Sequence, residues 1–245
     1  IPPEPPHLPP RQRVEESSIE LGHTHVSWHI PDIRHEDLPA LETLSIILGG
    51  GRSSRLYRSL REEQGIVHAI DAWTYNPGNP GLFGISAVFD GGQYEKAVQG
   101  IEAELQGVRE KGVTSSEVAK AVKQFTSSTL AARKTMQGQA QDLGGAWMAA
   151  RDLGFSNRYL SQVQSITAEK IVEVANRYMF PDNRSTFALL PKGSSPVSLK
   201  KSANVHRTEI EKWEPGNGMR VLFKQDDRLP FVEIRSVFFG GVLEE

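Results

Sequence analysis

Apolar and polar residues alternate over residues 19–30, which is the pattern of a β-strand with one buried face. Val26, Trp28 and Ile30 lie on one side of this predicted strand, whereas His25 lies on the other. The same reasoning, together with flanking turn sequences such as NPGNPG, predicts more strands. These strands lie at 66–73, 82–89 and 185–190.

Apolar residues at helical spacing predict most of the remaining structure. The predicted helices cover 39–48, 53–65, 93–111, 114–150 and 167–178. In one of them Ala97, Ile101 and Leu105 recur every four residues and define a buried stripe. Thr114 and Glu117, in the sequence TSSE, have the spacing of a capping box at the start of the next helix.

Strands and helices in this order predict an α+β fold, with an antiparallel sheet of about five strands packed against helices. Six of the first ten residues are proline, so residues 1–18 are predicted to be an extended linker arm. The domain proper is expected at 19–190 and a polar linker at 191–210. The strand-like sequences MRVLFKQ and FVEIRSVFFGG suggest that 211–245 open another domain.

The composition changes this picture little. Charged residues make up 24% of the 245-residue chain, and the net charge of −2 gives no sign of a nucleic-acid partner. The sequence has no apolar run long enough to predict a membrane span. Because there is no cysteine, disulfides and thiolate zinc sites are excluded. The start at Ile1, without an apolar leader, suggests a processed piece of a longer protein.

The sequence LGGGRSSRL has the outline of a phosphate-binding loop but lacks its chemistry. A P-loop needs a lysine after the last glycine and a strand before the first. Here Gly49, Gly50 and Gly51 follow a predicted helix, and no lysine is in place. A tight turn between two helices, with Ser53 as the cap of the second, explains the sequence better.

Candidate catalytic residues are scarce. His23, His25 and His29 share a strand face and could bind a metal, but no carboxylate stands at ligand spacing, and a polar strand face is the favoured interpretation. The sequence contains neither H-x-x-E-H nor H-E-x-x-H, and no G-x-S-x-G. Three large side chains on the predicted helices are interpreted as core residues, namely Phe125, Met136 and Trp147.

The segment THVSWHIPDIRHEDLPALETLSIILGGGRSSRLYRSLREEQGIVHAI resembles the second domain of the pitrilysin/insulinase zinc metallopeptidases, which include the mitochondrial processing peptidases. NRSTFALLPKG is similar to the closing strand of that domain, and the tail to the next family repeat. The resemblance implies a fold of the LuxS/MPP-like metallopeptidase type. It also marks a family turn motif, formed by Gly49, Gly50, Gly51, Ser53, Ser54 and Arg55.

The resemblance places the zinc outside this chain. In the family an inverted H-x-x-E-H motif in a sibling domain holds the metal, so we expect no metal or cofactor here. Active copies of the distal half carry an Arg and a Tyr seven residues apart, which face the zinc. Arg61 matches the arginine, but His68 stands at the tyrosine position. These two are therefore candidates for substrate contact, or simply a helix-end cation and a strand residue.

The resemblance favours a non-catalytic domain that walls the peptide chamber of a zinc metallopeptidase, supports its catalytic domain and does not cleave peptides alone. The expected partners are sibling peptidase domains and an extended peptide, in a periplasmic or cytoplasmic bacterial protein. The alternative is a scaffold of the same fold that has lost catalysis, like the core subunits of a respiratory complex. A stand-alone metal-binding module that uses the strand histidines is a third possibility.

Overall fold

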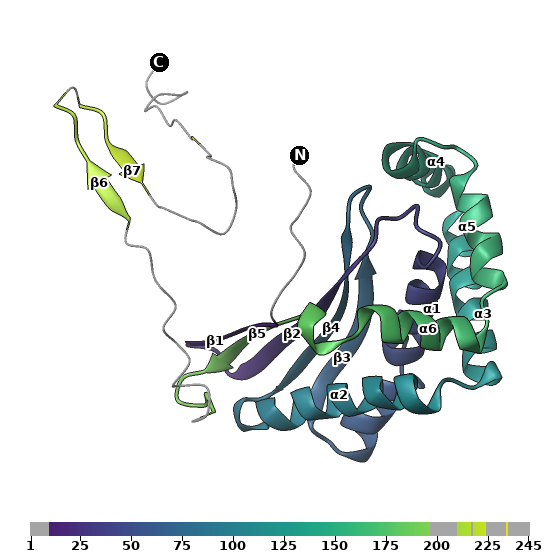
Figure 1. Ribbon diagram of the computed structural model, residues 1–245, viewed down its shortest axis with the longest axis horizontal. Coiled ribbons are helices and arrows are strands. Elements are labelled where there is room, and N and C mark those ends of the chain that lie inside the picture. The colour runs from purple at the N-terminus through teal and green to yellow at the C-terminus, as the bar shows by residue number, and fades with distance from the viewer. Residues whose placement is uncertain (1–9, 197–209, 217, 224–233, 235–245) are drawn as a thin grey trace. The chain divides into compact units, whose positions relative to one another are not determined.

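The computed structural model describes residues 10–196, 210–216, 218–223 and 234. The chain divides into two compact units, residues 1–200 and residues 201–245. The first unit contains a sheet with helices packed against it, and the second contains a short strand pair (Figure 1).

The first unit is built on a five-stranded sheet in the order β1–β5–β2–β4–β3. Its strands are β1 (Arg11–Ser17), β2 (Leu21–Ile30), β3 (Val67–Tyr75), β4 (Gly81–Asp90) and β5 (Arg184–Pro191). The pairs β3–β4, β4–β2 and β2–β5 are antiparallel, and β1 runs parallel to β5. The α+β prediction is confirmed, although the sheet is mixed and not wholly antiparallel.

Strand β1 corrects the predicted boundary at residue 18. Residues 11–17 were assigned to the linker arm, yet they pair with β5 along their whole length, from Arg11 opposite Ser185 to Ser17 opposite Pro191. The sequence RQRVEES is polar because β1 is an edge strand, with most of its side chains in solvent. Its hydrogen-bond partner lies at the other end of the domain sequence, so no local pattern reveals the strand.

The helices follow the predicted order with two corrections. They are α1 (Leu38–Gly49), the π-helical turn η1 (Tyr57–Glu63), η2 (Gly91–Gln93), α2 (Tyr94–Lys111), α3 (Ser115–Ala132), α4 (Met136–Ala150), α5 (Phe155–Gln164), α6 (Ala168–Tyr178) and η3 (Pro181–Asn183). The capping box of Thr114 and Glu117 at the start of α3 is confirmed. The helix predicted over 114–150 is two helices, because Thr135 caps α4 by accepting the Gly138 N–H at 3.0 Å. Helix α5 was not predicted.

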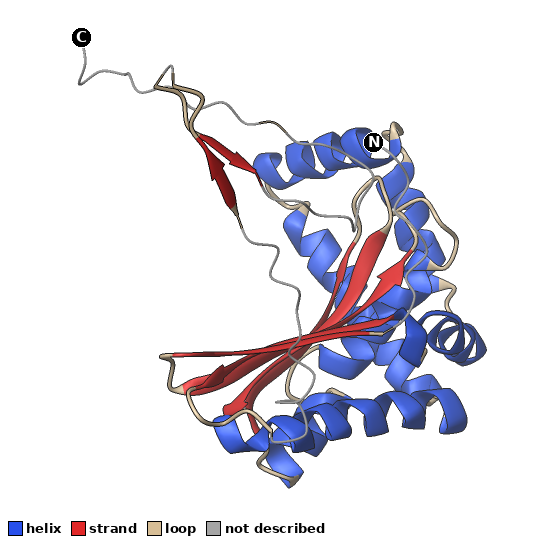
Figure 2. Ribbon diagram, turned by 60° about the vertical axis from the view of Figure 1, so that its left-hand side comes forward, coloured by secondary structure: helices blue, strands red, loops and turns tan. Residues whose placement is uncertain are grey.

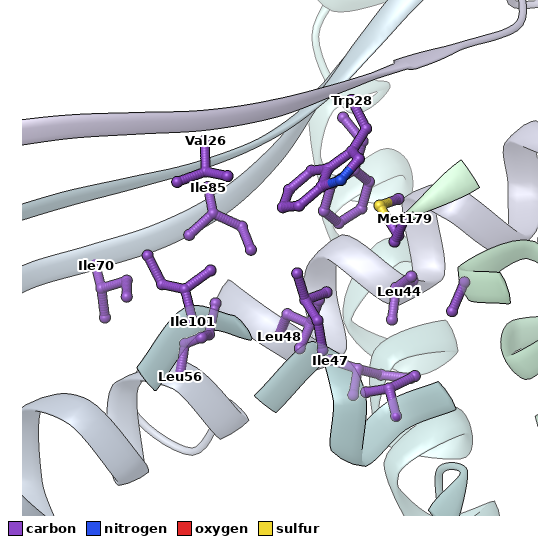
Figure 3. Close-up of a cluster of buried hydrophobic side chains, with 14 of the residues drawn as sticks. Val26, Trp28, Leu44, Ile47, Leu48, Leu56, Ile70, Ile85, Ile101 and Met179 are labelled. Carbon is purple, nitrogen blue, oxygen red and sulfur yellow. The ribbon is translucent and has the colours of Figure 1, made fainter. Parts of the chain in front are cut away.

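The core lies between one face of the sheet and the helices (Figures 2 and 3). Val26 and Trp28 of β2 and Ile85 of β4 point toward the helix layer, where Leu44 and Leu48 of α1 meet them. All five side chains are buried. Burying a side chain of this size stabilises the fold by roughly 1.5–3 kcal/mol, so this layer supplies most of the cohesion of the unit.

Two of the three residues interpreted as core lie in solvent. Met136 is 82% exposed and Trp147 is 48% exposed. Phe125 is half-buried and packs on Tyr159, with ring centroids 6.0 Å apart. Met136 and Trp147 belong to α4, which turns small residues toward the body of the domain.

A buried ionic cluster fastens α6 to the start of α1. Asp37 is fully buried, and its carboxylate lies 2.7 Å from Lys170 Nζ and 2.5 Å from an Arg177 guanidinium nitrogen. The Tyr178 hydroxyl donates to the same carboxylate at 2.7 Å. Burial raises the pKa of Asp37, but the hydrogen bonds from Lys170, Tyr178 and Arg177 outweigh it and hold the pKa below its usual value.

The second unit contains a two-stranded antiparallel sheet of β6 (Glu211–Trp213) and β7 (Val221–Phe223). Strand β7 lies within the predicted MRVLFKQ strand. The other predicted strand, FVEIRSVFFGG, lies outside the described residues except for Ile234. In the part of the chain that the structure describes, no helix combines the length and apolar character needed to cross a membrane.

Candidate functional site

The three glycines form the turn that ends α1 and allow the helix to lie directly on β3. A Cβ atom on Gly49 would lie 2.0 Å from the backbone nitrogen of Ala72, so only glycine fits there. The N–H of Gly50 donates to the carbonyl of Ile46 at 2.8 Å, and Gly51 has φ of +89°. The hydrogen bond of the Gly50 N–H and the positive φ of Gly51 are typical of the end of a helix, and neither indicates a phosphate-binding loop.

The two serines after the glycines hold this turn in place. The Ser54 hydroxyl donates to the Gly51 carbonyl at 2.7 Å, which closes the loop on itself. The Ser53 hydroxyl, predicted to cap the next helix, contacts Lys120 Nζ of α3 instead. The pair therefore joins the glycine turn to the helix layer.

Arg55 connects the segment before η1 to the junction between α2 and α3. Its guanidinium donates to both oxygens of Glu117, at 2.6 and 2.9 Å, and to the carbonyl of Gly112 at 3.0 Å. The hydrogen bond from Arg55, together with bonds from Thr114, lowers the pKa of Glu117 to about 2. Arg55 thus has a structural partner that accounts for its place in the motif.

The structure does not join the two substrate-contact candidates. Arg61 lies on η1 with its guanidinium 4.8 Å from the ring centroid of Tyr57. His68 lies at a bulge in β3 and its Nε2 is 3.0 Å from a carboxylate oxygen of Asp90. Both side chains are exposed. No hydrogen bond or ring contact links them among the described residues, so their seven-residue spacing places them on separate elements.

The sheet has a second face, which the helices do not cover (Figure 2). We call it the open face; it is the side on which His25 of β2, Ser86 of β4 and Asp71 of β3 lie. These residues are directly opposite one another across three neighbouring strands, and Phe187 of β5 continues the row beyond His25. Strand spacing of about 4.8 Å makes this a continuous row of side chains.

Hydrogen bonds organise the middle of the row. The indole N–H of Trp73 donates to the Ser86 hydroxyl at 2.7 Å, and that hydroxyl lies 2.9 Å from Nδ1 of His25. The Trp73 ring covers Gly84, where a Cβ would lie 2.1 Å from the indole. An indole nitrogen can only donate, and the Ser86 oxygen has two lone pairs, so the tautomer of His25 decides whether Ser86 donates to Nδ1 or accepts from it.

Asp71 completes the row with a carboxylate. Burial raises the pKa of Asp71, and the nearby His25 partly offsets this effect. The open face therefore presents a hydrogen-bond acceptor at Asp71, a hydrogen-bonding imidazole at His25 and aromatic surface at Trp73 and Phe187. Sequence reasoning singled out His25 alone, because the strand register that aligns the other three cannot be read from the sequence.

The strand histidines do not form a metal site among the residues that the structure describes. His23 and His25 are exposed on the open face, but among the described residues no three His, Cys, Asp or Glu side chains come close enough to hold an ion. The Ser86–His25–Asp71 row also differs from a catalytic triad, because the serine stands between the other two residues.

A groove of about 620 Å³ lies elsewhere, between α3 and the connection from α5 to α6. Val118, Val122 and Ile166 supply its apolar lining, and Lys123 and Glu169 are the charged residues there. It brings together no nucleophile with a base, so we assign it no chemistry.

Solved proteins share this arrangement of a sheet covered by helices on one face. A protease from Helicobacter pylori superposes with a TM-score of 0.70 at 21% identity, over 77% of this chain and 46% of that one. A peptidase M16 inactive domain from Pseudomonas fluorescens superposes with a TM-score of 0.69 at 17% identity, over 79% and 46%. At these identities the likeness concerns the fold alone.

The sequence gives the family. Residues 1–125 match the family described as "Peptidase M16 inactive domain", and the chain belongs to it. A Streptomyces coelicolor protein named "uncharacterized zinc protease" is 29% identical over 202 residues, which are 79% of this chain and 41% of that protein. The chain spans less than half the length of the curated relatives it matches. The resemblance to the zinc metallopeptidases is confirmed.

Proposed function

We propose that this chain is the non-catalytic supporting domain of a zinc metallopeptidase, and that its open face forms part of the wall of the peptide chamber. The observation that carries the proposal is the match to an inactive peptidase domain. The open face supports it, because a peptide-binding wall needs hydrogen-bonding and aromatic side chains that the core does not use.

The row on the open face has the chemistry for holding an extended peptide. A peptide backbone offers N–H donors and C=O acceptors at regular intervals. The Asp71 carboxylate would accept from an N–H, and Nε2 of His25 would donate to a carbonyl in the tautomer in which Ser86 donates to Nδ1. Trp73 and Phe187 would provide contact area for side chains of many kinds. Such contacts position a substrate without selecting one sequence.

Hydrolysis would be carried out elsewhere in the longer protein. The zinc, the water that it activates and a glutamate base would belong to a sibling domain with the H-x-x-E-H motif. Arg61 and His68 remain candidate substrate contacts at the η1 and β3 edge of the unit. The partners in this proposal are the sibling peptidase domains and an extended or unfolded peptide.

The test is a kinetic measurement on the longer polypeptide with a fluorogenic, unstructured peptide. Asp71→Asn should raise KM about three- to tenfold and leave kcat nearly unchanged, because the charge-assisted hydrogen bond of the carboxylate becomes a neutral one that is weaker by about 1 kcal/mol. Glu169→Gln is the matched control, since it removes a carboxylate from α6 on the covered side of the sheet. Equal KM values for wild type, Asp71→Asn and Glu169→Gln would mean that the open face does not contact the substrate and is not part of the chamber wall.

The scaffold alternative makes a different prediction for the same preparation. A scaffold would bind its assembly partners but would neither retain zinc nor cleave the peptide. Zinc content and peptide hydrolysis of the longer polypeptide therefore separate the two functions. Stoichiometric zinc on the isolated 245-residue chain would instead support the metal-binding module.

A further inference from the structure

Helix α4 exposes its large apolar side chains and meets the rest of the domain through small residues. Ala146 is its one buried residue among those that the structure describes. Gly138 lies so close to the end of α3 that a Cβ would be 1.8 Å from the Ala132 carbonyl oxygen, and the backbone of Ala149 lies against Gly78 in the β3–β4 turn. Small residues therefore attach α4 to the domain, whereas its large apolar side chains are exposed.

The outward residues form a regular seam. Met136, Ala140, Leu143 and Trp147 follow one another at intervals of four, three and four residues, which places them on one side of the helix. We call these four residues the outer seam. All of them are exposed, and Met148 extends the apolar surface beside Trp147. This spacing is typical of a helix that packs along another apolar surface.

The surroundings of the seam are nearly free of uncompensated charge. Asp142 is the one charged residue of α4, and its carboxylate lies 3.0 Å from Nε of Arg133. The Arg151 guanidinium lies 5.9 Å from the Trp147 ring centroid and caps one end of the seam. Leu130 before the helix and Leu153 after it are exposed as well. An apolar patch of this kind marks an interaction surface.

We propose that the outer seam of α4 docks against an apolar surface of the zinc-bearing sibling domain of the same polypeptide, an inference that rests on the proposed function. A 15-residue helix is about 22 Å long, so the seam covers on the order of 300 Å². A free complex needs roughly 800 Å² on each partner. The seam is too small for a dimer of separate chains, but a tethered domain, at high effective concentration, needs no such area.

The test compares amide hydrogen exchange of α4 in the longer polypeptide and in the isolated 245-residue chain. The amides of residues 140–148 should exchange at least about tenfold more slowly in the longer polypeptide, because docking removes local opening of the helix. Leu143→Glu in the longer polypeptide should restore the fast exchange. Gln141→Glu is the matched control, since it puts the same charge at an exposed position of α4 outside the seam.

Equal exchange of α4 in the two proteins would overturn the inference, even if the Asp71→Asn kinetics support the proposed function. Slow exchange in the isolated chain, with sedimentation that depends on concentration and is altered by Leu143→Glu, would also overturn it, because the occupant would be a second copy. If α4 is protected in the longer polypeptide but Asp71→Asn leaves KM unchanged, the docking of α4 is supported. The proposal that the open face forms the chamber wall is then rejected.

Discussion

Helices α1 and α4 both carry little charge, but α1 is buried in the core and α4 is mostly exposed. Each contains a single charged residue, Glu42 in α1 and Asp142 in α4, among mostly apolar and small residues. Nine of the twelve residues of α1 are buried, whereas only Ala146 is buried in α4. A low content of charged residues alone therefore does not decide which helix joins the core.

The direction of the large side chains explains the difference. In α1 the leucines point at the sheet, and Glu42 accepts hydrogen bonds from Thr74 at 2.8 Å and Asn76 at 3.0 Å. Burial raises the pKa of Glu42, which shows how far α1 is withdrawn from water. In α4 the small residues Gly138, Ala146 and Ala149 meet the rest of the domain, so the apolar area of its large side chains is left available for binding.

The largest effect is expected from removing the same side chain from both helices. Leu44→Ala in α1 should lower the free energy of unfolding by about 3 kcal/mol, because it opens a cavity in the core. Leu143→Ala in α4 should change it by less than about 0.5 kcal/mol in the isolated chain, since that leucine is 49% exposed. Urea unfolding of the two variants measures both values. Similar losses would mean that α4 is packed into the isolated domain.

Glycine replacements sharpen the same contrast and should have opposite signs. Gly49→Ala should cost about 2–3 kcal/mol, because the new Cβ would meet the backbone of β3 and push α1 away from the sheet. Gly144→Ala should stabilise the isolated chain by about 0.5–1 kcal/mol, since a Cβ there meets open space and alanine favours the helix. Thermal unfolding of both variants provides the comparison. A loss at Gly144 would show that a neighbour already covers that side of α4.

The sequence predicts α1 correctly and α4 incorrectly for a physical reason. Helical spacing identifies an apolar side of a helix, but it does not tell whether that side meets the body of the same domain. The sequence interpretation of Met136 and Trp147 as core residues rests on their being large apolar side chains on a helix, which are most simply buried. That interpretation correctly identifies apolar residues that need a packing partner, but it places the partner within the same domain.

The same limit applies to the sheet and to the candidate site. Strand β2 alternates clearly, so its covered and open faces could be predicted together with His25. Strand β1 and the alignment of Asp71 with Ser86 depend on register between strands far apart in the sequence. Local motifs such as the capping box of Thr114 are found because all of their atoms lie within one turn.

A smaller effect is expected at the ion pair that joins the segment before η1 to the helix layer. Arg55→Ala should lower the free energy of unfolding at pH 7 by about 1–2 kcal/mol, because Glu117 loses a bidentate, charge-assisted partner. Arg55 is the main cause that lowers the pKa of Glu117 from 4.5 to about 2. The stability that follows from this shift is complete above pH 4.5 and is lost as the pH falls from 4.5 through 2.

The variant should therefore show a weaker pH dependence in that window. Wild type and Arg55→Ala should differ most near neutral pH and converge as the pH approaches 2. Urea unfolding at a series of pH values from 2 to 7 measures the two curves. Parallel curves would mean that another group, and not Arg55, sets the pKa of Glu117. Arg58→Ala is the control, because its contact with Glu63 at 3.8 Å lies in solvent.

The smallest effect is expected at His68, one of the two candidate substrate contacts. His68 and Asp90 form a pair in which both side chains are more than half exposed, so a double-mutant cycle of His68→Ala and Asp90→Ala should give a coupling below about 0.5 kcal/mol. Such a pair is also screened by salt, and the coupling should fall further at about 1 M sodium chloride. A coupling above about 1.5 kcal/mol would instead make His68 a structural residue of the β3 bulge. If the coupling is small, a rise in KM of the longer polypeptide on His68→Ala can be read directly as lost substrate contact, because the fold does not depend on that side chain.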